Sequence, residues 1–189
     1  MEKEDRTENY KSYHLSLTEV LKIAAIAFAV QYIIFNFFIV YAIIPSGSME
    51  STINIGDKII ADRVLFRISG VERGDIIIFH PPIEDKERAY YVKRVIGMPG
   101  DTIEGIDGYV YINGEKLEET YTKEFIDEDF GPYIVPNDCY FMLGDNRTNS
   151  YDSRSWNNKY ISSDKIVGKA ILKYNGSFYI FKTPSYNIK

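Results

Sequence analysis

The chain has 189 residues, 45% hydrophobic, 15% aromatic and 26% charged, which suits one domain with a real core and excludes a disordered chain. One cysteine excludes a disulfide scaffold, and two histidines are too few for a histidine metal cluster, so we predict no metal and no cofactor. The net charge of −5 offers no basic footprint, and we exclude nucleic acid as a partner.

The first element is an uncharged run over residues 23–44, in which only Gln31 and Asn36 are clearly polar. As a helix it would measure about 33 Å, close to the roughly 30 Å of bilayer hydrocarbon. The run is longer than the apolar core of a cleavable signal peptide. We therefore predict an uncleaved transmembrane anchor at 23–44 after an N-terminal segment, 1–22. A buried core helix is the alternative, although so short a chain could hardly surround one.

Basic residues near the ends of this run indicate its orientation. Four precede it and two follow it closely: Lys3, Arg6, Lys11 and Lys22, then Lys58 and Arg63. Basic segments flanking a span tend to stay in the cytoplasm. We expect a single-pass protein of the cell membrane, with a cytoplasmic N-terminus and residues 45–189 outside the cytoplasm.

Beyond the anchor the pattern is that of strands. Runs rich in β-branched residues occupy 57–64, 74–79, 90–96, 109–112, 139–143, 167–174 and 178–181. Asn113-Gly114 and Asn175-Gly176 are hairpin signals. This predicts a mainly β, antiparallel domain over 45–189. The acidic, irregular stretch 113–136 is predicted to be a surface insertion or lid.

A serine-rich segment, Pro45-Ser46-Gly47-Ser48-Met49, follows the anchor directly. The glycine permits a tight backbone path between two hydroxyls, either in a plain turn or in a loop presenting a nucleophile. Ser48 lies four residues beyond Ile44, which limits it to roughly 15 Å from the end of the predicted anchor. We expect Met49 to help this surface enter the lipid interface.

A lysine stands in the middle of the strand predicted at 90–96. Strand alternation puts Tyr91, Lys93 and Val95 on one face. Desolvation between two apolar neighbours would lower the pKa of this lysine, and a neutral lysine is a usable general base. A lysine that extends its amine from an edge strand into water is the alternative.

A polar segment, 144–154, follows a hydrophobic strand. It is not a calcium loop, because Ser150 and Trp156 stand where such a loop needs glycine and glutamate. It is either a solvated turn or one part of a buried ionic network formed by Asp145, Asp152, Arg94, Arg147 and Arg154. Other nucleophile schemes are weaker, since His14 lies before the anchor, His80 precedes two prolines, and Cys139 opens a strand.

Four segments, in this order, resemble bacterial type I signal peptidases of the compact, single-span Gram-positive kind. Residues 45–57 resemble the nucleophile motif of that family, 73–79 its next strand, 90–101 its lysine motif and 144–154 its last motif. The resemblance runs from the anchor to about Ala170.

The resemblance implies a membrane-bound serine endopeptidase that removes N-terminal signal peptides from exported preproteins, on a β-rich core shared with self-cleaving SOS repressors. By motif match, Ser48 is the nucleophile and Lys93 its general base. The Ser46 hydroxyl and the Ser48 N–H would form the oxyanion hole, and Ser150 would orient Lys93. The ionic network would comprise Arg94, Asp145, Asp152 and Arg154. Expected partners are preproteins with small residues at −1 and −3, membrane lipids and the nearby translocon.

Two segments depart from the family pattern, Glu50-Ser51-Thr52 and Ser155-Trp156-Asn157-Asn158. They bear on substrate preference and docking at the membrane rather than on the chemistry. Two alternative functions stay open: a dedicated pilin-processing peptidase, or a catalytically silent, membrane-tethered β module acting in pilus assembly.

Overall fold

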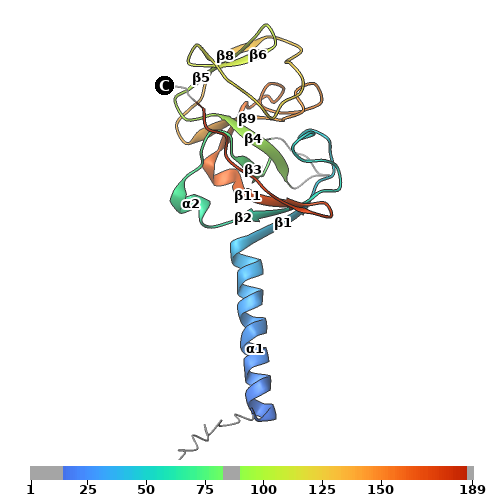
Figure 1. Ribbon diagram of the computed structural model, residues 1–189. Helices are drawn as coiled ribbons and strands as arrows, with labels where there is room; N and C mark the ends of the chain where they lie inside the picture. The colour runs from blue at the N-terminus through green and yellow to red at the C-terminus, as the bar shows by residue number, and fades with distance from the viewer. Residues whose placement is uncertain (1–14, 83–89, 187–189) are drawn as a thin grey trace, which may run out of the picture.

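The computed structural model describes residues 15–82 and 90–186, in which a long N-terminal helix stands apart from a β-rich domain (Figure 1). The helical elements are α1 (Leu17–Ile33), which continues into a π-helical segment, η1 (Ile34–Phe38), then a short helix, α2 (Phe66–Ser69), and a 3-10 turn, η2 (Ser163–Lys165). The strands are β1 (Ile39–Ile43), β2 (Lys58–Asp62), β3 (Ile76–Phe79), β4 (Tyr91–Gly97), β5 (Thr102–Ile106), β6 (Tyr109–Ile112), β7 (Glu115–Lys116), β8 (Phe130–Ile134), β9 (Cys139–Leu143), β10 (Tyr160–Ser162), β11 (Ile166–Tyr174) and β12 (Phe178–Ile180).

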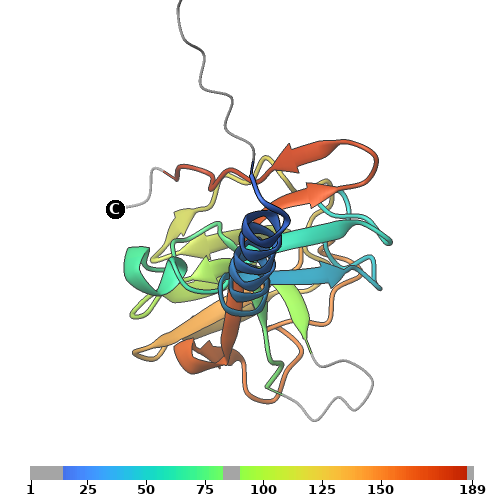
Figure 2. The ribbon, with the colours of Figure 1, turned by 90° about the horizontal axis from the view of Figure 1, so that it is seen from below.

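The N-terminal helix begins with a capping box. The Glu19 N–H donates to the Ser16 hydroxyl, and the Ser16 N–H donates to the Glu19 carboxylate at 2.7 Å, which satisfies two donors at the helix start. From Leu17 to Phe38 the helix is long and apolar enough to cross a membrane, and none of its apolar stretch is buried by the domain. Figure 2 looks along this helix and shows the domain spread around its axis.

The predicted helix bounds, 23–44, are wrong at both ends. The helix starts at Leu17 because of its cap, and the chain turns at Ile39 into β1, which pairs with β2 from Ile39↔Asp62 to Ile43↔Lys58. Within β1, Val40 is buried while Tyr41 is exposed, as in an edge strand covered on one face. An apolar run alone does not distinguish helix from strand. Ser48 is therefore ten residues beyond the helix, and the limit of roughly 15 Å does not apply.

The domain consists of two antiparallel sheets, and the predicted fold class, mainly antiparallel β with one N-terminal apolar helix, is confirmed. The larger sheet has the order β1-β2-β11-β3-β4-β9-β10, with β12 paired to the far part of β11. The smaller sheet has the order β7-β6-β5-β8. This topology places β4 inside the larger sheet, between β3 and β9.

Both hairpin signals mark hairpins. Asn113 and Gly114 have φ values of 52° and 81° between β6 and β7, as a type I′ turn requires. The second hairpin joins β11 to β12 through three residues, 175–177, because Tyr174 pairs with Phe178.

The stretch 113–136 is an integral part of the smaller sheet rather than an added lid. It supplies β7 and β8, and its apolar residues Leu117, Ile126 and Val135 are buried in the core shared with β5, β6 and β9. Its acidic residues stand in groups between these buried positions, which is why composition alone suggested a surface insertion.

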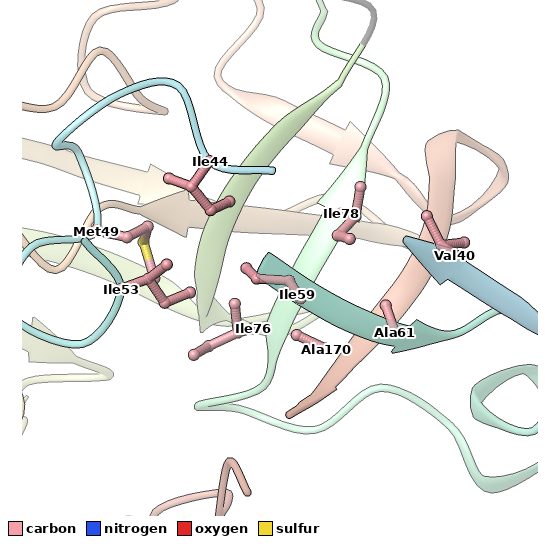
Figure 3. Close-up of a cluster of buried hydrophobic side chains, with 9 residues drawn as sticks. All are labelled: Val40, Ile44, Met49, Ile53, Ile59, Ala61, Ile76, Ile78 and Ala170. Atoms are coloured by element: carbon pink, nitrogen blue, oxygen red, sulfur yellow. The ribbon is translucent and has the colours of Figure 1, made fainter. Parts of the chain in front are cut away.

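A hydrophobic cluster lies beneath the segment that carries Ser48 (Figure 3). Met49 and Ile53, 1% and 0% exposed, pack there against side chains of β2 and β3, including Ile59 and Ile76. The expectation that Met49 contacts lipid is therefore wrong. Met49 instead packs into the core and thereby anchors the segment that carries Ser48.

Candidate active site

The segment between β1 and β2 holds Ser48 in a fixed loop. The buried Met49 and Ile53 anchor it from below. The Asn146 backbone N–H also donates to the Ser48 carbonyl at 3.1 Å, and its side-chain amide donates to the Gly47 carbonyl at 3.0 Å. The loop is thus held by buried side chains and by backbone hydrogen bonds, which leaves the Ser48 hydroxyl with a defined position.

Lys93 lies on the interior strand β4 and is 4% exposed. Its Nζ is 2.5 Å from Ser48 Oγ, within hydrogen-bonding distance, and 5.5 Å from the centroid of the Tyr91 ring. The structure therefore brings the candidate nucleophile and the candidate base together. Lys93 and Tyr91 share a face of the strand, as its alternation predicts.

A cavity of about 240 Å³ opens over this pair of residues. Ser46, Ser48 and Lys93 line it together with apolar and aromatic side chains, among them Ile44, Tyr91 and Tyr151. A hydroxyl and an amine thus face one small cavity that an extended peptide could enter.

Ser150 is close to this centre but does not make the predicted contact. Its hydroxyl is buried and has no hydrogen-bond partner within the described residues, so the bond to Lys93 expected from the resemblance is not formed here. It packs against Gly144, where a Cβ would lie 2.2 Å from Ser150 Oγ and 2.4 Å from the Ser48 carbonyl. Only a glycine leaves room for both groups.

Behind the cavity, Arg94 and Asp145 form a buried bidentate ion pair. Arg94 Nε and Nη2 donate to the two carboxylate oxygens at 2.8 and 2.6 Å, and Nη1 donates to the Gly74 carbonyl at 2.7 Å. Burial disfavours the charged guanidinium, but the hydrogen bonds to Asp145 and the charge interactions with that carboxylate and two tyrosines together outweigh this, and the pKa of Arg94 is raised. The Thr52 hydroxyl, from the loop of Ser48, also donates to Asp145 at 2.5 Å.

Asp152 and Arg154 form a second pair. Arg154 Nε donates to Asp152 Oδ1 at 2.9 Å, and the Gly144 N–H donates to Asp152 Oδ2 at 3.0 Å. Arg154 also donates to the Arg147 carbonyl at 2.8 Å. The structure thus brings together the carboxylates and arginines expected in the network as two pairs that support the turn between β9 and β10.

Arg147 has a partner that sequence reasoning missed. It makes a bidentate pair with Glu119 at 2.7 and 2.5 Å, and its Nε donates to the Gly144 carbonyl at 3.0 Å. Glu119 comes from the stretch predicted to be a lid, so no local signal marks it. Thr52 and Asn146 were also missed as supports of the site, although Asn146 lies within the polar segment 144–154.

Tyr121 connects this pair to Arg94. Its ring centroid lies 3.8 Å from the Arg94 guanidinium carbon, its hydroxyl donates to Glu119 at 2.6 Å, and it accepts from Tyr186 at 2.9 Å. Burial, followed by the charge of Glu119, raises the pKa of Tyr121 well above its usual value.

Within residues 15–82 and 90–186, no three histidine, cysteine or acidic side chains gather as metal ligands would.

A serine hydroxyl beside a buried lysine amine, in a cavity of an antiparallel β domain, is the arrangement needed by a serine hydrolase that uses lysine in place of histidine. Residues 17–175 match the family described as signal peptidase, peptidase S26. The chain belongs to this family.

Individual relatives agree with this assignment. The chain is 40% identical over 134 residues to a probable signal peptidase I-2 from Synechocystis, covering 69% of this chain and 61% of that protein. It is 34% identical over 151 residues to signal peptidase I S from Bacillus subtilis, covering 74% and 79%. The match thus spans less than two thirds of the Synechocystis protein.

A solved structure of a signal peptidase I from Enterococcus faecalis is 33% identical. The match covers 53% of this chain and 96% of that chain, with a TM-score of 0.45.

Proposed function

We propose that the chain is a membrane-bound serine endopeptidase that cleaves N-terminal signal peptides from exported preproteins. The observation that carries this proposal is the 2.5 Å contact between Ser48 Oγ and Lys93 Nζ, both of which line a cavity of about 240 Å³. Family membership supports the substrate class. An intact hydroxyl and amine at this distance favour a catalyst over the silent assembly module, and nothing in the site favours a pilin substrate.

In the proposed acylation step, neutral Lys93 accepts the Ser48 proton as Oγ attacks the scissile carbonyl carbon. The tetrahedral intermediate collapses when Lys93 returns that proton to the leaving amine, which leaves an acyl-enzyme at Ser48. Lys93 then takes a proton from water as the water attacks the ester, and it returns that proton to Ser48 Oγ when the second product leaves. Burial of Lys93 supports this role because a desolvated amine resists protonation.

The oxyanion would be stabilised by the Ser48 N–H and the Ser46 hydroxyl, which lines the same cavity. Ser150 would orient Lys93 by a hydrogen bond formed when substrate fills the cavity. Its buried hydroxyl, without a partner among the described residues, supports such a role. Arg94, Asp145, Asp152 and Arg154 would act as supports that do not touch the substrate.

The expected preference for small residues at −1 and −3 belongs to the same proposal, in which Ile44, Tyr91 and Tyr151 of the cavity lining would contact those side chains. We place the N-terminus in the cytoplasm and the catalytic domain outside the cell membrane, on the charge bias around the helix. In that orientation the site would meet preproteins at the translocon exit and face membrane lipid.

The test is cleavage of a preprotein with alanine at −3 and −1 by the full chain in detergent micelles, with products identified by mass spectrometry. We expect Ser48→Ala and Lys93→Ala to abolish cleavage while the thermal melting curve persists. Ser51→Ala is the matched control, since its hydroxyl donates to the Tyr121 carbonyl outside the cavity. Cleavage by Ser48→Ala at the wild-type rate would refute the proposal.

A pH profile tests the lysine separately. Only the neutral amine can accept a proton, so the cleavage rate should fall as the pH is lowered and Lys93 becomes protonated. A rate independent of pH down to about pH 5 contradicts a lysine base.

A further inference from the structure

A second and larger cavity, of about 510 Å³, lies on the far side of the Ser48 loop. Its walls come from four parts of the chain: the loop of Ser48, the paired strands β3 and β4, the segment after β7 that holds Thr120 and Tyr121, and the C-terminal stretch from Lys173 to Pro184. It shares no residue with the cavity over Lys93.

The charge of this second cavity is of one sign. Four of its lining side chains are cationic, Arg94, Lys123, Lys173 and Lys182, and none is acidic. This contrasts with a chain whose net charge is −5. A cavity lined by charges of one sign concentrates the electrostatic potential and attracts ions of the opposite charge.

Two of the four cationic side chains already form ion pairs with carboxylates of the protein. Arg94 is held by Asp145, and Lys173 lies 3.3 Å from Asp57 and donates to the Thr52 carbonyl at 2.6 Å. Lys123 and Lys182 form no ion pair with any carboxylate of the described residues. The cavity therefore presents two ammonium groups that have no carboxylate partner among the described residues, from two separate segments, beside the ion-paired Arg94 and Lys173.

We propose that this cavity binds a phosphate group. A phosphate carries several acceptor oxygens and can bridge lysines on different walls, each of which offers three donors. The Thr120 side chain adds a hydroxyl to the lining. The proposal does not depend on the proposed cleavage reaction.

The phosphate is either free in solution or part of a phospholipid headgroup. Figure 1 shows the β11–β12 hairpin at the end of the domain nearest α1, and Tyr179 of this hairpin, which lines the cavity, is 56% exposed. This position makes a headgroup accessible if α1 spans the membrane. The phosphate chemistry is the same for both sources, so the experiment separates them.

The test uses the full chain and thermal melting. In micelles of uncharged detergent, inorganic phosphate is titrated against chloride at constant ionic strength. In parallel, nanodiscs of phosphatidylglycerol, whose headgroup phosphate leaves a net negative charge, are compared with nanodiscs of phosphatidylcholine, whose choline cation balances its phosphate. A ligand that binds only the folded state raises the melting temperature in a saturable way. A rise with inorganic phosphate assigns a soluble ligand, and a rise only in phosphatidylglycerol assigns a headgroup.

The variant Lys123→Gln/Lys182→Gln should weaken this binding roughly tenfold, since it removes both of these ammonium charges. The control Lys116→Gln/Lys165→Gln changes the net charge equally, lies outside the cavity lining and should bind as wild type. No rise with either ligand, or a rise that the first variant retains in full, overturns the proposal. Because melting is read without substrate, this outcome is independent of whether the chain cleaves preproteins.

Discussion

Replacing Glu119 by glutamine tests whether the pair with Arg147 supports the site. The Arg147 and Glu119 side chains are only 2% and 7% exposed, so neither charge can be solvated when its partner is lost. Breaking a buried ion pair on one side costs about 3–5 kcal/mol. The glutamine oxygen can still accept one bond, and Arg147 keeps the Gly144 carbonyl, so we expect the lower end, about 3 kcal/mol.

For a chain of this length that loss corresponds to a fall of roughly 6–12 °C in melting temperature. The assay is thermal unfolding of the full chain in detergent, followed by intrinsic fluorescence. Glu118→Gln is the matched control, because Glu118 is exposed and its substitution should change stability by less than about 0.5 kcal/mol. A loss below about 1 kcal/mol for Glu119→Gln would refute the view that this pair is a buried support.

Three further predictions concern neighbouring groups. Gly144→Ala places a Cβ 2.4 Å from the Ser48 carbonyl, so preprotein cleavage should fall by about 100-fold or more, and an unchanged rate contradicts the packing described. Asp152→Asn leaves the Arg154 guanidinium without its carboxylate and should lower stability by about 2–4 kcal/mol in the same thermal assay. Burial raises the pKa of Tyr186 to about 12, so the folded state favours its protonated form. Stability should therefore decline as the pH rises from about 10 to about 12, and Tyr186→Phe should lack this component.

Strands with an uninterrupted apolar pattern could be predicted from the sequence, whereas β5 and β8 could not. β5 contains Gly105, and β8 contains Gly131 and Pro132, residues that indicate turns when only the chain is read. In the folded protein these residues lie in paired strands, because the packing of the side chains around them favours the strand over the turn. A Cβ on Gly105 would lie 2.4 Å from the Phe130 ring, so the glycine is what allows β8 to pair with β5.

The proposed catalytic pair could be located from the sequence because the segments around Ser48 and Lys93 resemble two motifs of the signal peptidase family. Local pattern alone places Lys93 on the strand face of Tyr91 but leaves a plain turn at Ser48 and an edge-strand lysine at Lys93 as alternatives. The supports of the site could not all be found this way. Glu119 and Arg147 are 28 positions apart and meet only because the smaller sheet folds back toward the turn after β9. The residue pattern within either segment does not predict that these two side chains come into contact.

The corrected end of the N-terminal helix bears on how the site is positioned. The Arg63 N–H donates to the Phe38 carbonyl and its guanidinium to the Asn36 carbonyl, both at 3.0 Å, so two carbonyls at the helix end are satisfied by the residue after β2. β1 follows Phe38 at once and is paired with β2 along its whole length, without a flexible linker. Its five residues extend about 17 Å, and the strand runs to one side of the helix axis, across the direction of α1, before the chain enters the loop of Ser48 (Figure 2). The position of Ser48 relative to the end of α1 is therefore set by a paired strand at the base of the domain. Because side chains alternate along β1, an insertion of one residue before Val40 would also turn that side chain out of the core, so this position cannot change in small steps.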